Sequence, residues 1–269
     1  MTLPRYLISL VFLAISSICI AASTSDLAKE KRWEEQIVPS LMVGDAVKLK
    51  ANGTEFLALY TENEADHTHG AALVIHGIGI HPAWPDIIEP TRIDLPEHGW
   101  HTLSLQMPIL PNEAESKDYV PLMEEVPSRI KAGVNFLKAK GINNIVIIAH
   151  SLGTVMSAYY LANKPDPTVR AYVAIGMSRF SFDDRYSNVK NLAKIQMPIL
   201  DIYGSEDLSS VVSSADVRLR AGKQANKPTY TQIKVPGANH FFDNMNDILI
   251  KRIRGWLNKH AKGVELKTN

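Results

Sequence analysis

The chain has 269 residues, of which 45% are hydrophobic, and its 29 basic and 28 acidic residues leave a formal net charge of +1. This length and composition allow a sizeable core in a single domain, and the balanced charge argues against a nucleic-acid-binding protein, which needs a strongly basic face. Because the chain has one cysteine, an internal disulfide framework is excluded.

The first residues have the three parts of a secretory signal peptide. Arg5 precedes an apolar run (residues 7–20), and small residues follow it. This run is shorter than the roughly 20 apolar residues that span a bilayer, so we favour cleavage near Ala22 or Ser23 over an uncleaved inner-membrane anchor. The sequence therefore predicts a signal peptide (residues 1–22), a single domain without a stable membrane span (residues 23–269), and a periplasmic or secreted protein.

The start of the mature domain is predicted to form a helix followed by a β-hairpin. Residues 25–41 combine charged with scattered apolar side chains, which indicates a structural helix laid on the body of the protein. Residues 46–50 and 55–60 alternate apolar and polar side chains on either side of Asn52-Gly53. This pattern is typical of two antiparallel strands joined by a tight turn.

The polar stretch over residues 61–70 is expected to be an exposed loop. Its two histidines, His67 and His69, have no cysteine or third ligand beside them. A zinc site takes about three or four protein ligands, so we expect no metal at this loop.

The apolar residues 72–75 predict a buried strand that opens into the loop His76-Gly77-Ile78-Gly79. Glycine lets the backbone approach a ligand closely, so N–H groups of this loop can face a reacting oxygen. Phosphate binding is the competing use, but the loop has neither a Walker lysine nor the spacing G-x-G-x-x-G. We expect the loop to form one wall of a preformed site.

The rest of the chain alternates predicted helices with predicted strands. An amphipathic helix is expected over residues 122–137, with a kink at Pro127. Such alternation calls for a mostly parallel sheet with helices on both faces. Further helices are expected over residues 86–98 and 245–257, and further strands over residues 100–106, 171–175, 199–203 and 230–235.

A predicted strand and a predicted helix meet at Ser151. Residues 145–148 are four consecutive β-branched residues, which indicate a strand buried on both faces, and apolar residues recur at helical spacing from Leu152 onward. Ser151 therefore lies on a sharp turn, the context of a nucleophile elbow, although a serine that caps the helix is the alternative. Ala149 replaces the first glycine of the motif G-x-S-x-G, and we expect the turn to tolerate the added methyl group.

Two later loops supply partners for this serine. Asp207 follows the strand over residues 199–203, and ligand sites in open α/β sheets lie at the carboxyl ends of strands. Glu206 is a neighbour that can substitute for it, whereas Asp201 lies too deep within the strand. His240 follows the last predicted strand, so the chain order is serine, acid, histidine.

These residue types suit nucleophilic catalysis. Ser151 is a weak nucleophile until His240 accepts its proton, and His240 can then return this proton to the leaving group. Asp207 would orient the imidazole ring and stabilise its charged form. The N–H groups of Ile78 and Leu152 would hold the substrate oxygen as an oxyanion hole. This chemistry needs no metal or organic cofactor.

Two further histidines, His76 and His150, flank the predicted site. We expect them to be packing or hydrogen-bonding residues rather than bases.

The predicted site resembles that of the α/β-hydrolase superfamily. The resemblance rests on the elbow Ala149-His150-Ser151-Leu152-Gly153, the His76-Gly77 loop, Asp207 and His240. More narrowly, residues 56–60, 76–85 and 99–108 resemble an uncharacterised family of exported bacterial proteins with a hydrolase-like fold. The resemblance implies an α/β-hydrolase fold with a mostly parallel central sheet, helices on both faces and an N-terminal β-hairpin. It also implies a serine hydrolase of the bacterial envelope, with no particular substrate.

Residues 177–197 separate two predicted strands and leave room for one short helix. We therefore expect a small or absent lid over a fairly open cleft. Phe180, Phe182 and Tyr186 would line the acyl side of this cleft or pack in the core.

The leading hypothesis is an exported serine hydrolase that cleaves carboxylic esters or thioesters through a Ser-His-Asp triad and an acyl-enzyme. Its substrate would be a small-molecule or lipid-like ester. A second hypothesis, motivated by Ala149, is a catalytically inactive hydrolase-fold protein that serves as an envelope binding or scaffold protein. Acyl transfer or peptide cleavage by the same triad is a third, because function belongs to the site rather than to the fold.

Overall fold

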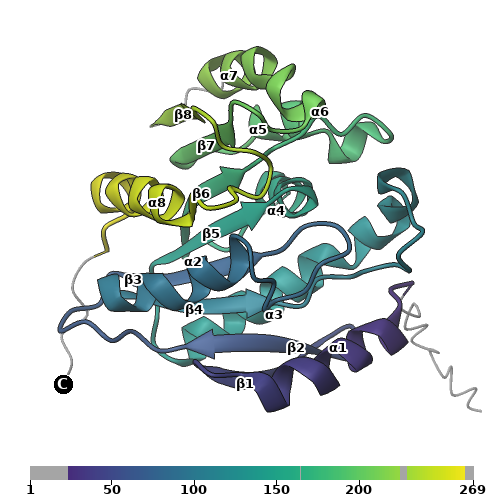
Figure 1. The fold of residues 1–269 in the computed structure, drawn as a ribbon, viewed down its shortest axis with the longest axis vertical. Helices are drawn as coiled ribbons and strands as arrows, with labels where there is room; N and C mark the ends of the chain where they lie inside the picture. The colour runs from purple at the N-terminus through teal and green to yellow at the C-terminus, as the bar shows by residue number, and fades with distance from the viewer. Residues whose placement is uncertain (1–23, 164, 225–228, 264–269) are drawn as a thin grey trace, which may run out of the picture.

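An eight-stranded sheet in the order β1-β2-β4-β3-β5-β6-β7-β8 forms the centre of the protein (Figure 1). The computed structural model describes residues 24–163, 165–224 and 229–263, so the predicted signal peptide lies outside the described residues. The strands are β1 (Asp45–Ala51), β2 (Thr54–Thr61), β3 (Gly70–Ile75), β4 (Trp100–Leu105), β5 (Ile145–His150), β6 (Val169–Ile175), β7 (Ile199–Gly204) and β8 (Tyr230–Val235).

The sheet is mostly parallel, as predicted. β1 and β2 form the antiparallel hairpin, β2 is antiparallel to β4, and all the other neighbouring strands run parallel. Parallel strands need both faces covered, which is why β5 is buried along its whole length. The carboxyl ends of β3 and β5 to β8 therefore meet at one edge of the sheet, where the predicted site residues follow them.

Helices cover both faces of the sheet (Figure 1). On one face the core includes residues of α3, α4, α5 and α7, and on the other face residues of α8 pack on β5 to β7, while α1 packs on β2. The helices are α1 (Leu27–Ser40), α2 (Ile88–Asp94), α3 (Val126–Ala139), α4 (Leu152–Ala162), α5 (Asn188–Leu192), α6 (Ser209–Val212), α7 (Ala215–Gln224) and α8 (Asn246–His260). Short 3₁₀ helices are η1 (Leu95–His98), η2 (Ser116–Tyr119), η3 (Pro121–Glu124) and η4 (Asp184–Tyr186).

Two predicted helices differ in detail from the structure. The helix expected over residues 86–98 is the short α2 followed by η1, which has Pro96 at its start. The predicted kink at Pro127 is wrong, because α3 begins at Val126 and the proline lies in its first turn. A missing N–H in the first turn removes no helical hydrogen bond, so the helix accepts the proline there.

The expected exposed loop over residues 61–70 is wrong at His69. This side chain is buried, its ring lies 5.8 Å from that of Trp100, and its main-chain N–H donates to Gly99 O at 2.6 Å. The end of the loop is thereby fixed beside the start of β4, one residue before the chain enters β3. His67 remains exposed.

The connection between β6 and β7 contains only η4 and α5, in agreement with the prediction of no large lid. Tyr186 and Phe180 are buried in the core, whereas Phe182 is 58% exposed. Of the three aromatic residues proposed for the acyl side, Phe182 is therefore the one free to contact a ligand. Within the described residues, none of the helices combines the length and the apolar character that a membrane span requires.

Candidate active site

Ser151 occupies a strained turn between β5 and α4. Its backbone has φ 54° and ψ −123°, a conformation that costs a non-glycine residue about 1–3 kcal/mol and persists only where surrounding structure enforces it. The Ser151 N–H donates to Ile175 O at 3.0 Å, which ties the turn to the end of β6. The sequence-based expectation of a sharp elbow is confirmed.

The two small residues of the elbow have different importance. A Cβ on Gly153 would lie 2.5 Å from His76 O and 2.6 Å from Ile75 O, so only glycine fits where α4 crosses the end of β3. Ala149 is fully buried within β5, and its methyl group is accommodated in the core. The turn therefore tolerates alanine at this position, as expected.

Three side chains from three loops form a hydrogen-bonded chain at the carboxyl edge of the sheet. His240 Nε2 lies 2.9 Å from Ser151 Oγ, and His240 Nδ1 lies 2.6 Å from Asp207 Oδ1. An ionised carboxylate only accepts hydrogen bonds, so Nδ1 carries the proton and Nε2 is left to accept the serine proton. The N–H of Leu208 donates to Asp207 Oδ1 at 2.7 Å and holds the carboxylate in place.

The structure separates the three carboxylates that the sequence offered. Asp207 is the one beside the histidine, and it is 8% exposed. Glu206 is exposed to solvent. Asp201 is fully buried within β7 and pairs with Arg218 at 2.9 Å, so it lies too deep to reach the site, as expected.

Gly176 is a site residue that the sequence analysis missed. It follows β6 with φ 60°, and a Cβ there would lie 3.0 Å from His240 Cε1 and 3.3 Å from Asp207 Oδ2. The absence of a side chain gives the histidine and the carboxylate room to meet. The signal available in the sequence was a glycine directly after the predicted buried strand over residues 171–175.

His150 holds the loop that carries the histidine of the triad. Its Nε2 donates to the main-chain oxygen of His240 at 3.0 Å, and the two rings lie 4.8 Å apart. Burial, together with the nearby His240, lowers the pKa of His150 to about 3, so the ring is neutral at physiological pH. It is a hydrogen-bonding residue rather than a base, as expected.

The N–H groups of Ile78 and Leu152 are available for a substrate oxygen. Leu152 is the first residue of α4, where the N–H has no partner inside the helix. Gly77 packs against the nucleophile, since a Cβ on it would lie 2.9 Å from Ser151 Cβ, and this places the Gly77–Ile78 peptide beside the site. Among the described residues, neither N–H makes a hydrogen bond within the protein.

No group of three or more His, Cys, Asp or Glu side chains in the described part of the chain could hold a metal ion. The hydrogen-bonded chain of Ser151, His240 and Asp207 can support nucleophilic attack by the serine with proton transfer through the histidine.

Comparisons with known proteins identify the family and the fold of this chain. A family model described as "Protein of unknown function (DUF3530)" matches residues 4–121 and 111–259. Among curated proteins, none has a sequence that matches this chain.

Solved structures with a similar fold include hydrolases at low sequence identity. Est1E from Butyrivibrio proteoclasticus, also solved with ferulic acid bound, has a TM-score of 0.64 at 14% identity, over 80% of this chain and 98% of its own. The dienelactone hydrolase from Anabaena variabilis has a TM-score of 0.63 at 19% identity, over 81% and 97%. A lidless α/β serine hydrolase from Xanthomonas campestris has a TM-score of 0.60 at 15% identity, over 81% and 95%. These likenesses show the α/β-hydrolase fold.

Proposed function

Since this chain belongs to the family described as protein of unknown function (DUF3530) and has the α/β-hydrolase fold, we propose that it is an exported serine hydrolase of carboxylic esters or thioesters. The observation that carries the proposal is the hydrogen-bonded chain from Ser151 through His240 to Asp207. The strained backbone at Ser151 supports it further, because such strain concentrates at functional sites.

The reaction proceeds in two half-reactions. Ser151 Oγ attacks the carbonyl carbon of the ester while His240 Nε2 takes the serine proton, and the carbonyl oxygen becomes negatively charged. The N–H groups of Ile78 and Leu152 stabilise this oxygen. The intermediate then collapses to an acyl-enzyme, and His240 gives its proton to the departing alcohol or thiol.

In the second half-reaction, water attacks the acyl-enzyme. His240 takes a proton from the water, a second tetrahedral intermediate forms, and its collapse releases the carboxylic acid with the proton returned to Ser151 Oγ. Each of the two transition states places negative charge at the same oxyanion position. Removal of a donor there costs about 100-fold to 1,000-fold in kcat in other hydrolases.

The substrate is proposed to be a small-molecule or lipid-like ester. The short connection between β6 and β7 leaves the site without a large lid, and the exposed Phe182 lies on this connection. The similar structures include esterases and dienelactone hydrolases, and Est1E binds ferulic acid, so aromatic acyl groups belong among the first substrates to try.

Hydrolysis of a panel of esters tests this proposal. The purified protein and its Ser151→Ala variant are given p-nitrophenyl esters of increasing acyl length, a feruloyl ester and an acyl thioester. We expect turnover of at least one substrate by the wild-type protein and none by the variant. Equal rates in both proteins would refute the serine mechanism, and a folded protein inactive on the whole panel would favour the binding-only alternative.

Export is proposed from the signal-like sequence of the first 22 residues. The mass of the protein recovered from the envelope of a bacterial host tests it. We expect a mature chain that begins near Ser23, and a chain that retains Met1 would refute cleavage.

A further inference from the structure

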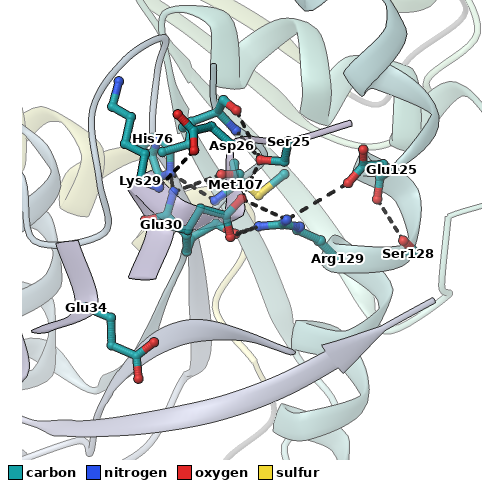
Figure 2. A network of polar contacts seen from close by, with 12 residues as sticks. Ser25, Asp26, Lys29, Glu30, Glu34, His76, Met107, Glu125, Ser128 and Arg129 are labelled. Atoms are coloured by element: carbon teal, nitrogen blue, oxygen red, sulfur yellow. Dashed lines mark hydrogen bonds and ion pairs between the residues drawn. The ribbon is translucent and has the colours of Figure 1, made fainter. Parts of the chain in front are cut away.

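A buried ion pair joins α1 to α3 (Figure 2). Glu30 of α1 and Arg129 of α3 are 7% and 2% exposed, and two hydrogen bonds of 2.9 Å connect their charged groups. Figure 2 shows Arg129 between Glu30 and Glu125, the second of which lies 4.0 Å away. Burial of such charges is unfavourable unless their hydrogen bonds are well made, so stability alone does not explain why this pair is buried.

Arg129 also holds one peptide group at the end of β4. Its Nη1 donates to Gln106 O at 2.9 Å, and the N–H of Met107 in the same peptide donates to His76 Nε2 at 2.9 Å. In a planar trans peptide the oxygen and the N–H point in opposite directions. The arginine and the histidine therefore hold this peptide from its two sides.

These contacts determine which ring nitrogen of His76 carries the proton. Burial lowers the pKa of His76 to about 3, so its ring is neutral and carries one proton. Because the Met107 N–H can only donate, Nε2 accepts, and the ring proton is on Nδ1. His76 Nδ1 lies 2.9 Å from Gly77 O and donates to it.

A second peptide group then leads to the candidate active site. Gly77 O belongs to the same peptide as the Ile78 N–H, one of the two proposed oxyanion donors. The hydrogen bond from His76 therefore turns the Ile78 N–H away from the histidine, on a loop that packs against Ser151. We call this chain of contacts the relay, and it comprises Glu30, Arg129, the Gln106–Met107 peptide, His76 and the Gly77–Ile78 peptide.

Every hydrogen bond from Arg129 onward donates in the same direction, from a buried cation toward the oxyanion position. Hydrogen bonds in such a chain polarise one another, and the low dielectric of the interior strengthens the effect. We propose that Arg129, held by Glu30, positions and polarises the Ile78 N–H for the developing oxyanion through the relay. This inference rests on the proposed serine hydrolase function and assigns Glu30, Arg129 and His76 to it as positioning residues.

Two substitutions at His76 test the central link. The amide of asparagine can replace the Nδ1 donor to Gly77 O, whereas the amide of glutamine reaches the Nε2 position and leaves Gly77 O without its donor. We expect His76→Gln to lower kcat by about 100-fold, the cost of one oxyanion donor, and His76→Asn to lower it by only about 10-fold. KM should change little in either variant, because the substrate is not bound more weakly in its ground state.

A merely structural role for His76 predicts something different. Both substitutions remove the same ring from the same buried position, so their melting temperatures and their kcat values would then fall together. Equal kcat values for the two variants would overturn the inference.

The ion pair is tested with a matched control on the opposite flank of the site. Glu30→Gln removes the two short hydrogen bonds of Arg129 to a carboxylate and leaves only the more distant Glu125 as an acidic neighbour. We expect kcat to fall by about 10-fold while the pH profile of kcat/KM keeps its shape, since the triad is untouched. Asp201→Asn breaks the equally buried pair with Arg218, and kcat should stay at the wild-type value. Full kcat in a folded Glu30→Gln variant would overturn the inference, and if this variant does not fold, the two His76 variants decide. A wild-type protein without hydrolase activity would refute the proposed function itself, and the relay with it.

Discussion

Asp201 and Asp207 belong to two neighbouring regions with opposite characters. Asp201 lies inside β7, where Arg218, Tyr230 and Gln232 donate to it over 2.7–2.9 Å, and we call these four residues the ionic cluster. Asp207 lies three residues beyond the strand, where it accepts from His240 and from the main-chain N–H groups of Leu208 and Gly204. The difference teaches that burial and charge alone do not mark a catalytic carboxylate. Asp207 differs from Asp201 in its place past the carboxyl end of the strand, where ligand sites of open α/β sheets lie, and in its contact with His240.

The largest effect on kcat is expected from a substitution of Asp207. Asp207→Asn removes the acceptor that fixes the proton on His240 Nδ1, so kcat should fall by about 10⁴-fold. The free energy of unfolding should change by about 1 kcal/mol or less, because one hydrogen bond is weakened and the packing is kept. Steady-state kinetics and urea unfolding measure the two quantities. A kcat within tenfold of wild type would mean that Asp207 is not the acid of the triad.

The opposite result is expected in the ionic cluster. Asp201→Asn leaves the fully buried Arg218 without a counter-charge, which should lower the free energy of unfolding by about 3–5 kcal/mol. In the protein that remains folded, kcat should be unchanged. Urea unfolding and kinetics below the unfolding transition separate these effects, and a large loss of kcat would erase the distinction between the two regions.

The region around the triad should lose stability in acid. His150 supports the triad with a folded-state pKa of about 3, below the value of about 6.5 in the unfolded chain. Protonation therefore favours the unfolded chain, and stability that is complete above about pH 6.5 is lost as the pH falls toward 3. Linkage gives this group a cost of about 3 kcal/mol at pH 4.

His150→Gln keeps a donor near the Nε2 position and removes the titrating ring. Between pH 7 and pH 4, the variant should lose about 3 kcal/mol less of its unfolding free energy than the wild-type protein does. Urea unfolding at both pH values measures the difference. Identical losses would mean that His150 is not held neutral by burial.

The smallest effect concerns the strain stored at the site. Ser151→Gly removes the side chain that makes φ 54° costly, so the free energy of unfolding should rise by about 1 kcal/mol although activity is lost. Ser151→Ala is the matched control, since alanine keeps the Cβ and therefore does not relieve the backbone strain. If both variants have the same stability, the elbow is not strained.

Local patterns were sufficient to predict much of the fold. The run of β-branched residues over 145–148 and the helical spacing after Leu152 gave the elbow, because both signals are short in sequence. The order of Ser151, Asp207 and His240, each directly after a strand, was enough to predict that the three meet at one edge of a parallel sheet. The structure brings them together, and their catalytic role stays a prediction.

Contacts between distant segments could not be predicted. Glu30 and Arg129 are 99 positions apart, and the N-terminal helix gave no sign that it contributes a buried charge. The position of β4 between β2 and β3 depends on the packing of the whole sheet. His69 was misjudged for the same reason, because its polar neighbours hide the fact that Trp100 covers it.

Labelling with a fluorophosphonate probe tests the central claim most directly. The probe reacts only with a serine that a neighbouring base activates, so it reports the triad without knowledge of the substrate. We predict one adduct, located on Ser151 by mass spectrometry, that is absent from the Ser151→Ala variant and forms much more slowly in Asp207→Asn. A folded wild-type protein that stays unlabelled, or that carries its adduct on another residue, would contradict the account.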